Sequence, residues 1–163
     1  MAYEFYVTIE GTKQGKFKGE SARKLHKEKI PAIGFSHEVT SPRDVATGQS
    51  SGKRQHGAIT FVKEWGPSSP QIFQALTTNE VLKSVLFEFV ATNSNGEEEI
   101  VDTIKLTNAA VSRMRRHLDV DAKHDSAIDI GPLDDVSLTY AKIELENRPG
   151  KTSAADDWGR GPR

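Results

Sequence analysis

The stretch His117–Asp125 holds the residue types that most readily bind a divalent metal ion. Its two imidazoles and two carboxylates belong to His117, Asp119, Asp121 and His124, and such donors suit zinc or a similar ion. As a calcium loop the stretch fails, because the sixth position counted from Asp119 is not glycine and the twelfth is Ile130, not glutamate. A solvated acidic turn between strands is the simpler interpretation, so we predict no metal site.

A second candidate for chemistry is Gly48–Arg54, which resembles a phosphate-binding loop. The spacing is one residue short, and Arg54 stands where a magnesium-binding serine or threonine is needed. The acidic pairs Asp134-Asp135 and Asp156-Asp157 are expected in a loop and in the tail, away from the apolar surroundings that separate two carboxyl pKa values. We therefore predict no catalytic residue, no cofactor and no enzyme activity.

The composition is that of one soluble domain. Of the 163 residues, 36% are hydrophobic and 28% are charged, and a chain of this length buries roughly 70% of its unfolded surface. The net charge of −1 argues against a free-standing nucleic-acid binder, and the absence of cysteine excludes a disulfide framework. The N-terminus lacks a secretory signal, and no run approaches the ~20 apolar residues of a membrane span. These features predict a cytoplasmic protein.

Alternating apolar residues predict a mainly β chain. Strands are expected over residues 3–10, 30–40, 59–65, 82–92, 99–116 and 135–146. Asn93–Gly96 predicts a hairpin turn, since Asn-Gly tolerates positive φ values. One helix should follow Gly66-Pro67, with Ser69 as its N-cap and Pro70 as its first residue. The apolar face of this helix is predicted to consist of Ile72, Phe73 and Leu76.

The remaining segments are expected outside the strands. Residues 11–29 are predicted to form a polar surface connection, and residues 119–133 an acidic loop. Ser41–His56 is a loop of about 16 residues, and loops longer than ~12 residues are usually functional or mobile. The folded domain is predicted to span residues 1–147, with a flexible tail over residues 148–163. Trp158 is unusually apolar for such a tail.

About six strands and one helix must hide their open edges within a single domain. A small β-barrel of two packed antiparallel sheets, closed or nearly closed, with one short helix on its side meets this requirement.

The order of these segments resembles the haemolysin-coregulated protein (Hcp) family, the tube subunit of bacterial type VI secretion systems. The opening strand with Val7–Gly11 and the turn Lys18–Ser21 are similar to the start of that family. Thr60–Lys63 followed by Ser69-Pro70 resembles its strand and helix, and Asp135–Ile143 resembles its closing strand. Each motif is weak alone, but their order and spacing are specific, and they cover most of the chain from Phe5 to Glu146.

The resemblance implies a barrel that assembles as a six-membered ring with an open centre, and rings that stack into a tube propelled from the cell by a contractile sheath. It also implies sheath, baseplate and spike proteins as partners, small effectors carried in the lumen, and export without a signal peptide. A projecting loop can reach the adjacent ring, so inter-subunit or inter-ring contacts are predicted for Val45, Gln49, Lys53, Arg54 and His56.

Two other functions stay open. A tube protein of a phage-derived contractile particle would share the same fold. A metal-dependent β-fold enzyme would use His117, Asp119, Asp121 and His124, provided that these residues converge in space.

Overall fold

A computed structural model describes residues 4–118 and 131–158, and strands make up more than half of these residues. The strands are β1 (Glu4–Gly11), β2 (Gly15–Lys16), β3 (Ile30–Ala32), β4 (Gly34–Ser36), β5 (Val39–Thr40), β6 (Gln55–His56), β7 (Ile59–Glu64), β8 (Leu82–Thr92), β9 (Glu98–His117), β10 (Leu133–Asn147) and β11 (Thr152–Asp157). A short 3₁₀ helix covers Lys24–His26, and one α-helix, α1, covers Ser68–Thr77. The predicted mainly β fold with one short helix is confirmed.

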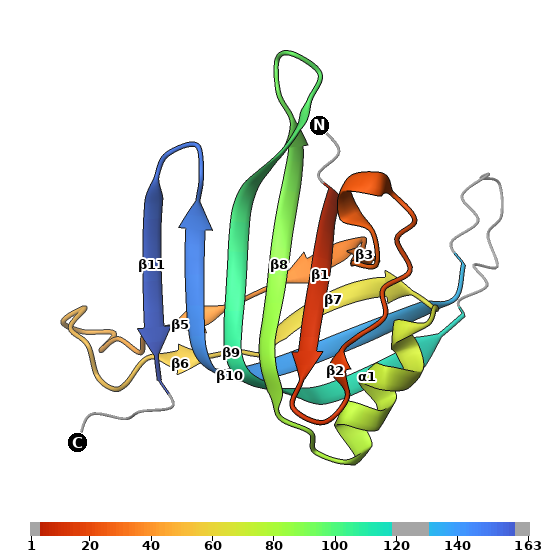
Figure 1. Ribbon diagram of the computed structural model, residues 1–163. Helices are drawn as coiled ribbons and strands as arrows, with labels where there is room; N and C mark the ends of the chain where they lie inside the picture. The colour runs from red at the N-terminus through yellow and green to blue at the C-terminus, as the bar shows by residue number, and fades with distance from the viewer. Residues whose placement is uncertain (1–3, 119–130, 159–163) are drawn as a thin grey trace, which may run out of the picture.

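Nine of these strands form one antiparallel sheet that curls around the core. Its order is β2-β1-β8-β9-β10-β7-β4, with β3 also paired to β1 and β11 also paired to β10. β5 and β6 form a separate two-stranded sheet. The long strands β9 and β10 bend along their length: one part of each stands upright between β8 and β11, and the other part runs across the lower half of the view (Figure 1).

The core fills the inside of this curl. Alternation places every second residue of β7, β8 and β10 inward, as the period of two requires. Phe61, Phe87 and Leu138 are each 0% exposed, and the rings of Phe61 and Phe87 pack edge to face with their centroids 5.7 Å apart. The core of the domain therefore lies on the inner side of the curled sheet.

The segment 30–36 connects the two ends of the sheet path. β3 pairs with β1 through Ala32, and β4 pairs with β7 through Phe35. Between them the N–H of Ile33 donates to the carbonyl of Val62 at 2.8 Å. The prediction of one continuous strand over residues 30–40 is thus wrong, because the chain changes partner at Ile33. This change of partner brings the β1 side and the β7 side of the sheet together, so the sheet is nearly closed without a continuous row of hydrogen-bonded strand pairs.

Helix α1 begins two residues earlier than predicted. Its N-cap is Pro67, not Ser69, so Ser69 and Pro70 both lie in the first helical turn. Pro70 is tolerated there because the first-turn N–H groups have no partner within the helix. Ile72 and Ala75 face the core, whereas Phe73 is 56% exposed. The assignment of Phe73 to the buried face is therefore wrong.

The segment after Asn147 is part of the sheet. Residues 152–157 form β11, which pairs antiparallel with β10 from Asn147 to Lys142. The N–H of Trp158 then donates to the carbonyl of Ala141 at 3.1 Å. The expected flexible tail is therefore, over these residues, an ordered edge strand that pairing with β10 holds in place.

Candidate functional site

The arm, residues 38–56, leaves the body at β5 and returns at β6. It projects from the body beside β11, at the lower left of Figure 1. Arg43 and Ser50 pair across the arm, and the carboxylate of Asp44 accepts the N–H groups of Ala46 and Thr47 at 2.7 and 3.2 Å. The tip is thus an ordered turn. Val45 at this tip is fully exposed.

The predicted contact residues of the arm fall into two groups. Val45, Gln49 and Lys53 are exposed on the projecting part, where a second molecule can reach them. Arg54 and His56 lie at the base and are held by the body of the same chain. A contact role for Arg54 and His56 would therefore be indirect, through the position of the arm.

The base cluster consists of His37, Arg54, His56, Tyr140, Asp156 and Trp158. The Tyr140 hydroxyl lies 3.0 Å from Nε2 of His37 and 2.9 Å from Nδ1 of His56. Nε2 of His56 lies 2.7 Å from Oδ2 of Asp156. The side chain of His56 is 3% exposed, and its ring stacks on the indole of Trp158 at 5.4 Å.

Charges and burial change the acid–base properties of the base cluster. The pKa of the Asp156 carboxyl is lowered, first by its hydrogen bond with Arg54 and then by that with His56. Burial, together with the charge of Asp156, raises the pKa of Tyr140 to about 12. Burial and the charge of His56 lower the pKa of His37. At neutral pH the tyrosine thus keeps its proton and Asp156 is ionised.

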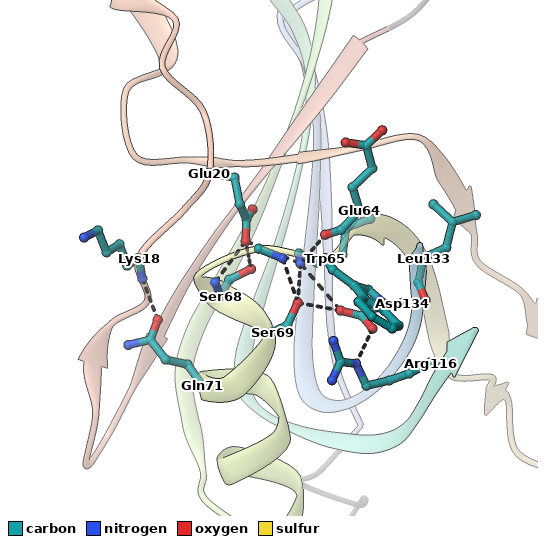
Figure 2. Close-up of polar contacts among 12 residues, drawn as sticks. Lys18, Glu20, Glu64, Trp65, Ser68, Ser69, Gln71, Arg116, Leu133 and Asp134 are labelled. Carbon is teal, nitrogen blue, oxygen red and sulfur yellow. Dashed lines mark hydrogen bonds and ion pairs between the residues drawn. The ribbon is translucent and has the colours of Figure 1, made fainter. Parts of the chain in front are cut away.

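A second polar group, the Lys63 cluster, lies where α1 begins and contains Glu20, Lys63, Ser69, Arg116 and Asp134. Nζ of Lys63, fully buried, donates to the carbonyl of Glu64 at 2.6 Å and to Oγ of Ser69 at 2.9 Å. It also lies 3.4 Å from a Glu20 oxygen and 3.7 Å from an Asp134 oxygen. Figure 2 shows these side chains converging from the sheet, the helix and the segment before the 3₁₀ helix.

Asp134 completes the Lys63 cluster. It is 0% exposed, accepts from Oγ of Ser69 at 2.6 Å, and pairs with Nε of Arg116 at 2.9 Å. The guanidinium of Arg116 also lies over the ring of Trp65, 4.2 Å from its centroid. The expectation that Asp134 lies in a loop is wrong: it belongs to β10 and points inward.

The combination of Ser69, Lys63 and Asp134 contains the residue types of a catalytic site. A nucleophilic serine needs an accessible oxygen and a base within reach. Ser69 is 2% exposed, its hydroxyl donates to Asp134, and its oxygen accepts from Lys63 and from the N–H of Gly66. The geometry therefore supports a structural role, in which the cluster ties the start of α1 to β7 and β10.

Gly48–Gly52 also spells Gly-x-Ser-x-Gly, a match that the prediction of no catalytic residue overlooked. A nucleophile elbow is a sharp turn between a strand and a helix. Ser50 instead lies in the exposed arm, where it pairs with Arg43 and its hydroxyl donates to the carbonyl of Gly52 at 3.2 Å. The match does not have the structure that the chemistry requires.

The proposed metal ligands lie mostly outside the described residues, which end at Leu118 and resume at Gly131. This applies to Asp119, Asp121 and His124. His117, at the end of β9, lies 3.3 Å from a carboxylate oxygen of Asp135. Among the residues that the structure describes, no three histidine, aspartate or glutamate side chains are grouped so as to hold a metal ion. Over the same residues, no helix has the length and apolar character to cross a membrane.

Comparison with known proteins identifies the family. The model of the family described as "Type VI secretion system effector, Hcp" matches residues 6–146. The "Major exported protein" of Pseudomonas aeruginosa is 30% identical over 97% of this chain and 96% of its own length.

Solved structures agree. A crystal structure titled as that of an Hcp protein superposes with a TM-score of 0.90 at 31% identity, over 98% of this chain and 100% of the other. The Hcp1 protein from E. coli EAEC 042 gives a TM-score of 0.84 at 27% identity, over 96% and 99% of the two chains. The secreted protein Hcp3 from Pseudomonas aeruginosa gives 0.78 at 26% identity, again over 96% and 99%. With the family model matching most of its length, the chain belongs to the Hcp family, the tube proteins of the type VI secretion system.

Proposed function

We propose that this chain is the non-enzymatic building block of a ring, and that six copies form the ring and stacked rings form a tube. The observation that carries this proposal is the edge strand β11. It is hydrogen-bonded to β10 on one side, and its first four residues, 152–155, include no proline and no charged side chain. Uncharged edges of this kind invite pairing with another chain. In a ring, the neighbouring copy supplies the partner.

Exposed apolar side chains support the same proposal. Leu25, Ile33 and Phe73 are each between 56% and 72% exposed. A specific interface needs about 800 Å² on each partner, and such residues supply apolar area for it. Identical head-to-tail contacts close into a ring when the rotation between neighbours fits. We propose that the tube then meets sheath, baseplate and spike proteins, that small effectors travel in the ring lumen, and that the cytoplasmic protein leaves the cell with the tube.

Native mass spectrometry tests the ring. At micromolar concentration the main species should have a mass of about 108 kDa, six times 18.0 kDa. A protein that stays at 18.0 kDa up to the highest soluble concentration would contradict the proposal.

For the arm, we propose that Val45, Gln49 and Lys53 contact the adjacent ring. Because Arg43 and Ser50 are paired, replacing residues 44–49 by Asn-Gly should close the shortened arm as a tight hairpin. The shortened protein should keep its ring mass and its melting temperature within about 2 °C, since residues 43–49 are all exposed. Its rings should no longer stack, as judged by tube length in negatively stained micrographs.

Matched substitutions refine this test. Val45 and Val81 are both exposed valines, but only Val45 lies on the arm. Val45→Asp should shorten the tubes, whereas Val81→Asp should leave their length unchanged. Tubes of full length from the shortened protein would show that the arm does not join the rings. Loss of folding would show that the tip belongs to the core.

A further inference from the structure

The arm has few connections to the body. β5 and β6 pair with each other in a sheet separate from the nine-stranded one. The side chains of the base cluster bridge the gap: His37 and His56 contact Tyr140 on β10, while Arg54 and His56 contact Asp156 on β11. The direction in which the arm points therefore depends on this cluster.

We propose that the base cluster is an acid-sensitive latch, in which protonation of the histidine pair releases the arm from β10 and β11. The latch is supported by the geometry of the contacts within the base cluster. Only the expected effect of the latch on ring stacking rests on the function proposed above for the arm.

The contacts define where the protons sit in the closed latch. The carboxylate of Asp156 only accepts, so Nε2 of His56 carries the hydrogen that lies between them. In neutral His56, Nδ1 then accepts from the Tyr140 hydroxyl, which in turn accepts from Nε2–H of His37. Each group thus donates to the next, from His37 to Tyr140 to His56 to Asp156. At the end of this series of hydrogen bonds, Arg54 donates two hydrogen bonds to the carboxylate of Asp156, at 2.5 and 2.8 Å.

One added proton fits this arrangement. A cationic His56 donates from both ring nitrogens, to Asp156 and to Tyr140. The Tyr140 hydroxyl can then turn to donate to Nε2 of His37, once neutral His37 carries its hydrogen on Nδ1 instead. The carboxylate of Asp156 balances the new charge. The cluster therefore stays connected with a single cationic histidine.

A second proton does not fit. With both rings cationic, both nitrogens that face Tyr140 carry hydrogens, and the hydroxyl hydrogen loses its acceptor. Two positive charges then lie on either side of one oxygen, next to the cation of Arg54. The acidic group that faces this pair is Asp156, which already bonds His56 and Arg54. His37 is two residues before Val39, so its departure draws β5 away from the body.

The direction of the pH effect follows from His37. Its pKa in the closed latch is lowered from 6.5 by burial and by the charge of His56. The open arm, with an ordinary histidine, binds the second proton at a higher pH than the closed latch does. The closed state is therefore favoured above pH 6.5 and loses stability as the pH falls below that value.

Hydrogen–deuterium exchange of the full chain tests the latch, on rings kept too dilute to stack and with rates corrected for the chemical effect of pH. The reporting amides are those of β5, β6 and Gly57, whose N–H donates to the carbonyl of Glu38 at 2.9 Å. An isolated two-stranded hairpin is only marginally stable, so this pairing should weaken once the base cluster no longer holds both strands against the body. The protection of these amides should fall between pH 7.5 and pH 5.5, by at most about tenfold, which is the limit for one linked proton over this range. Protection of β8 should stay unchanged over this range.

Two variants identify the group responsible. His37→Gln keeps an N–H donor near the position of Nε2 but does not titrate, so its arm protection should be independent of pH. His117→Gln removes a histidine outside the base cluster, which lies beside Asp135, and should keep the wild-type response.

A wild-type arm whose protection is independent of pH would overturn the latch, as would an unchanged response in His37→Gln or its loss in His117→Gln. If the arm opens in acid while tube length stays constant, the latch stands and the proposed stacking role of the arm fails. An arm that opens with shorter tubes supports both.

Discussion

Replacing Asp134 by alanine is expected to lower the free energy of unfolding by about 3–5 kcal/mol, the range found when one partner of a buried ion pair is removed. Asp134 is fully buried and bonds both Ser69 and Arg116. Without it, the buried ammonium of Lys63 keeps one carboxylate, Glu20 at 3.4 Å. Urea unfolding followed by circular dichroism, with all variants at one protein concentration, measures the loss.

The neighbouring residue offers a matched control. Asp135 points the other way from β10 and pairs at 3.5 Å with the half-exposed Arg115. Asp135→Ala should cost at most about 1 kcal/mol, as exposed ion pairs do. The double variant Lys63→Met, Asp134→Leu should lose less than Asp134→Ala alone, because it leaves no buried lysine without its counter-charge. Equal losses for Asp134→Ala and Asp135→Ala would show that the Lys63 cluster does not hold the fold together.

Strands with a regular inward face were predictable from the sequence. The bounds 82–92 predicted from alternation are those of β8. The turn predicted at Asn93–Gly96 is present, with Gly96 at a φ of 80°. In both places the local pattern and the final structure agree, because the pairing partner follows directly along the chain.

Changes of partner were not predictable in the same way. Residues 30–40 alternate like one strand, yet Ile33 is 63% exposed because the chain leaves β1 for β7 at that point. β11 contains no strongly apolar residue at all. It becomes a strand because the turn after Asn147 folds it back onto the available edge of β10, and the polar composition of β11 does not signal this pairing.

The prediction of a loop at Asp134 is wrong because the predicted start of the last strand is two residues too late. Beginning the strand at residue 135 assigns Asp134 to a loop. β10 begins at Leu133, so Asp134 shares the inward side with Val136 and Leu138. A start two residues earlier would have revealed a carboxylate on the same buried side of the domain as Lys63. The base cluster had no comparable signal, since His37, Tyr140 and Asp156 come from distant segments.

Replacing Phe61 by alanine is expected to cost about 3–5 kcal/mol of unfolding free energy, because it removes a large side chain from a closed core. Phe61 is 0% exposed and lies against Phe87 in the centre of the curl. Leu138 is buried to the same extent, and Leu138→Ala should cost about 2–5 kcal/mol for the same reason. Both losses should appear as a lower urea midpoint with an unchanged slope.

Phe73 is a matched control for Phe61, because it is also a phenylalanine but is 56% exposed on α1. Its replacement distinguishes a loss of core packing from a loss of contacts between subunits. In the isolated protomer Phe73→Ala should change the unfolding free energy by less than about 1 kcal/mol. A larger loss that appears only at concentrations where the ring forms would mean that the ring covers this side of α1. A larger loss at every concentration would mean that α1 buries Phe73 in the protomer and that the core extends further over the helix than the curl of the sheet.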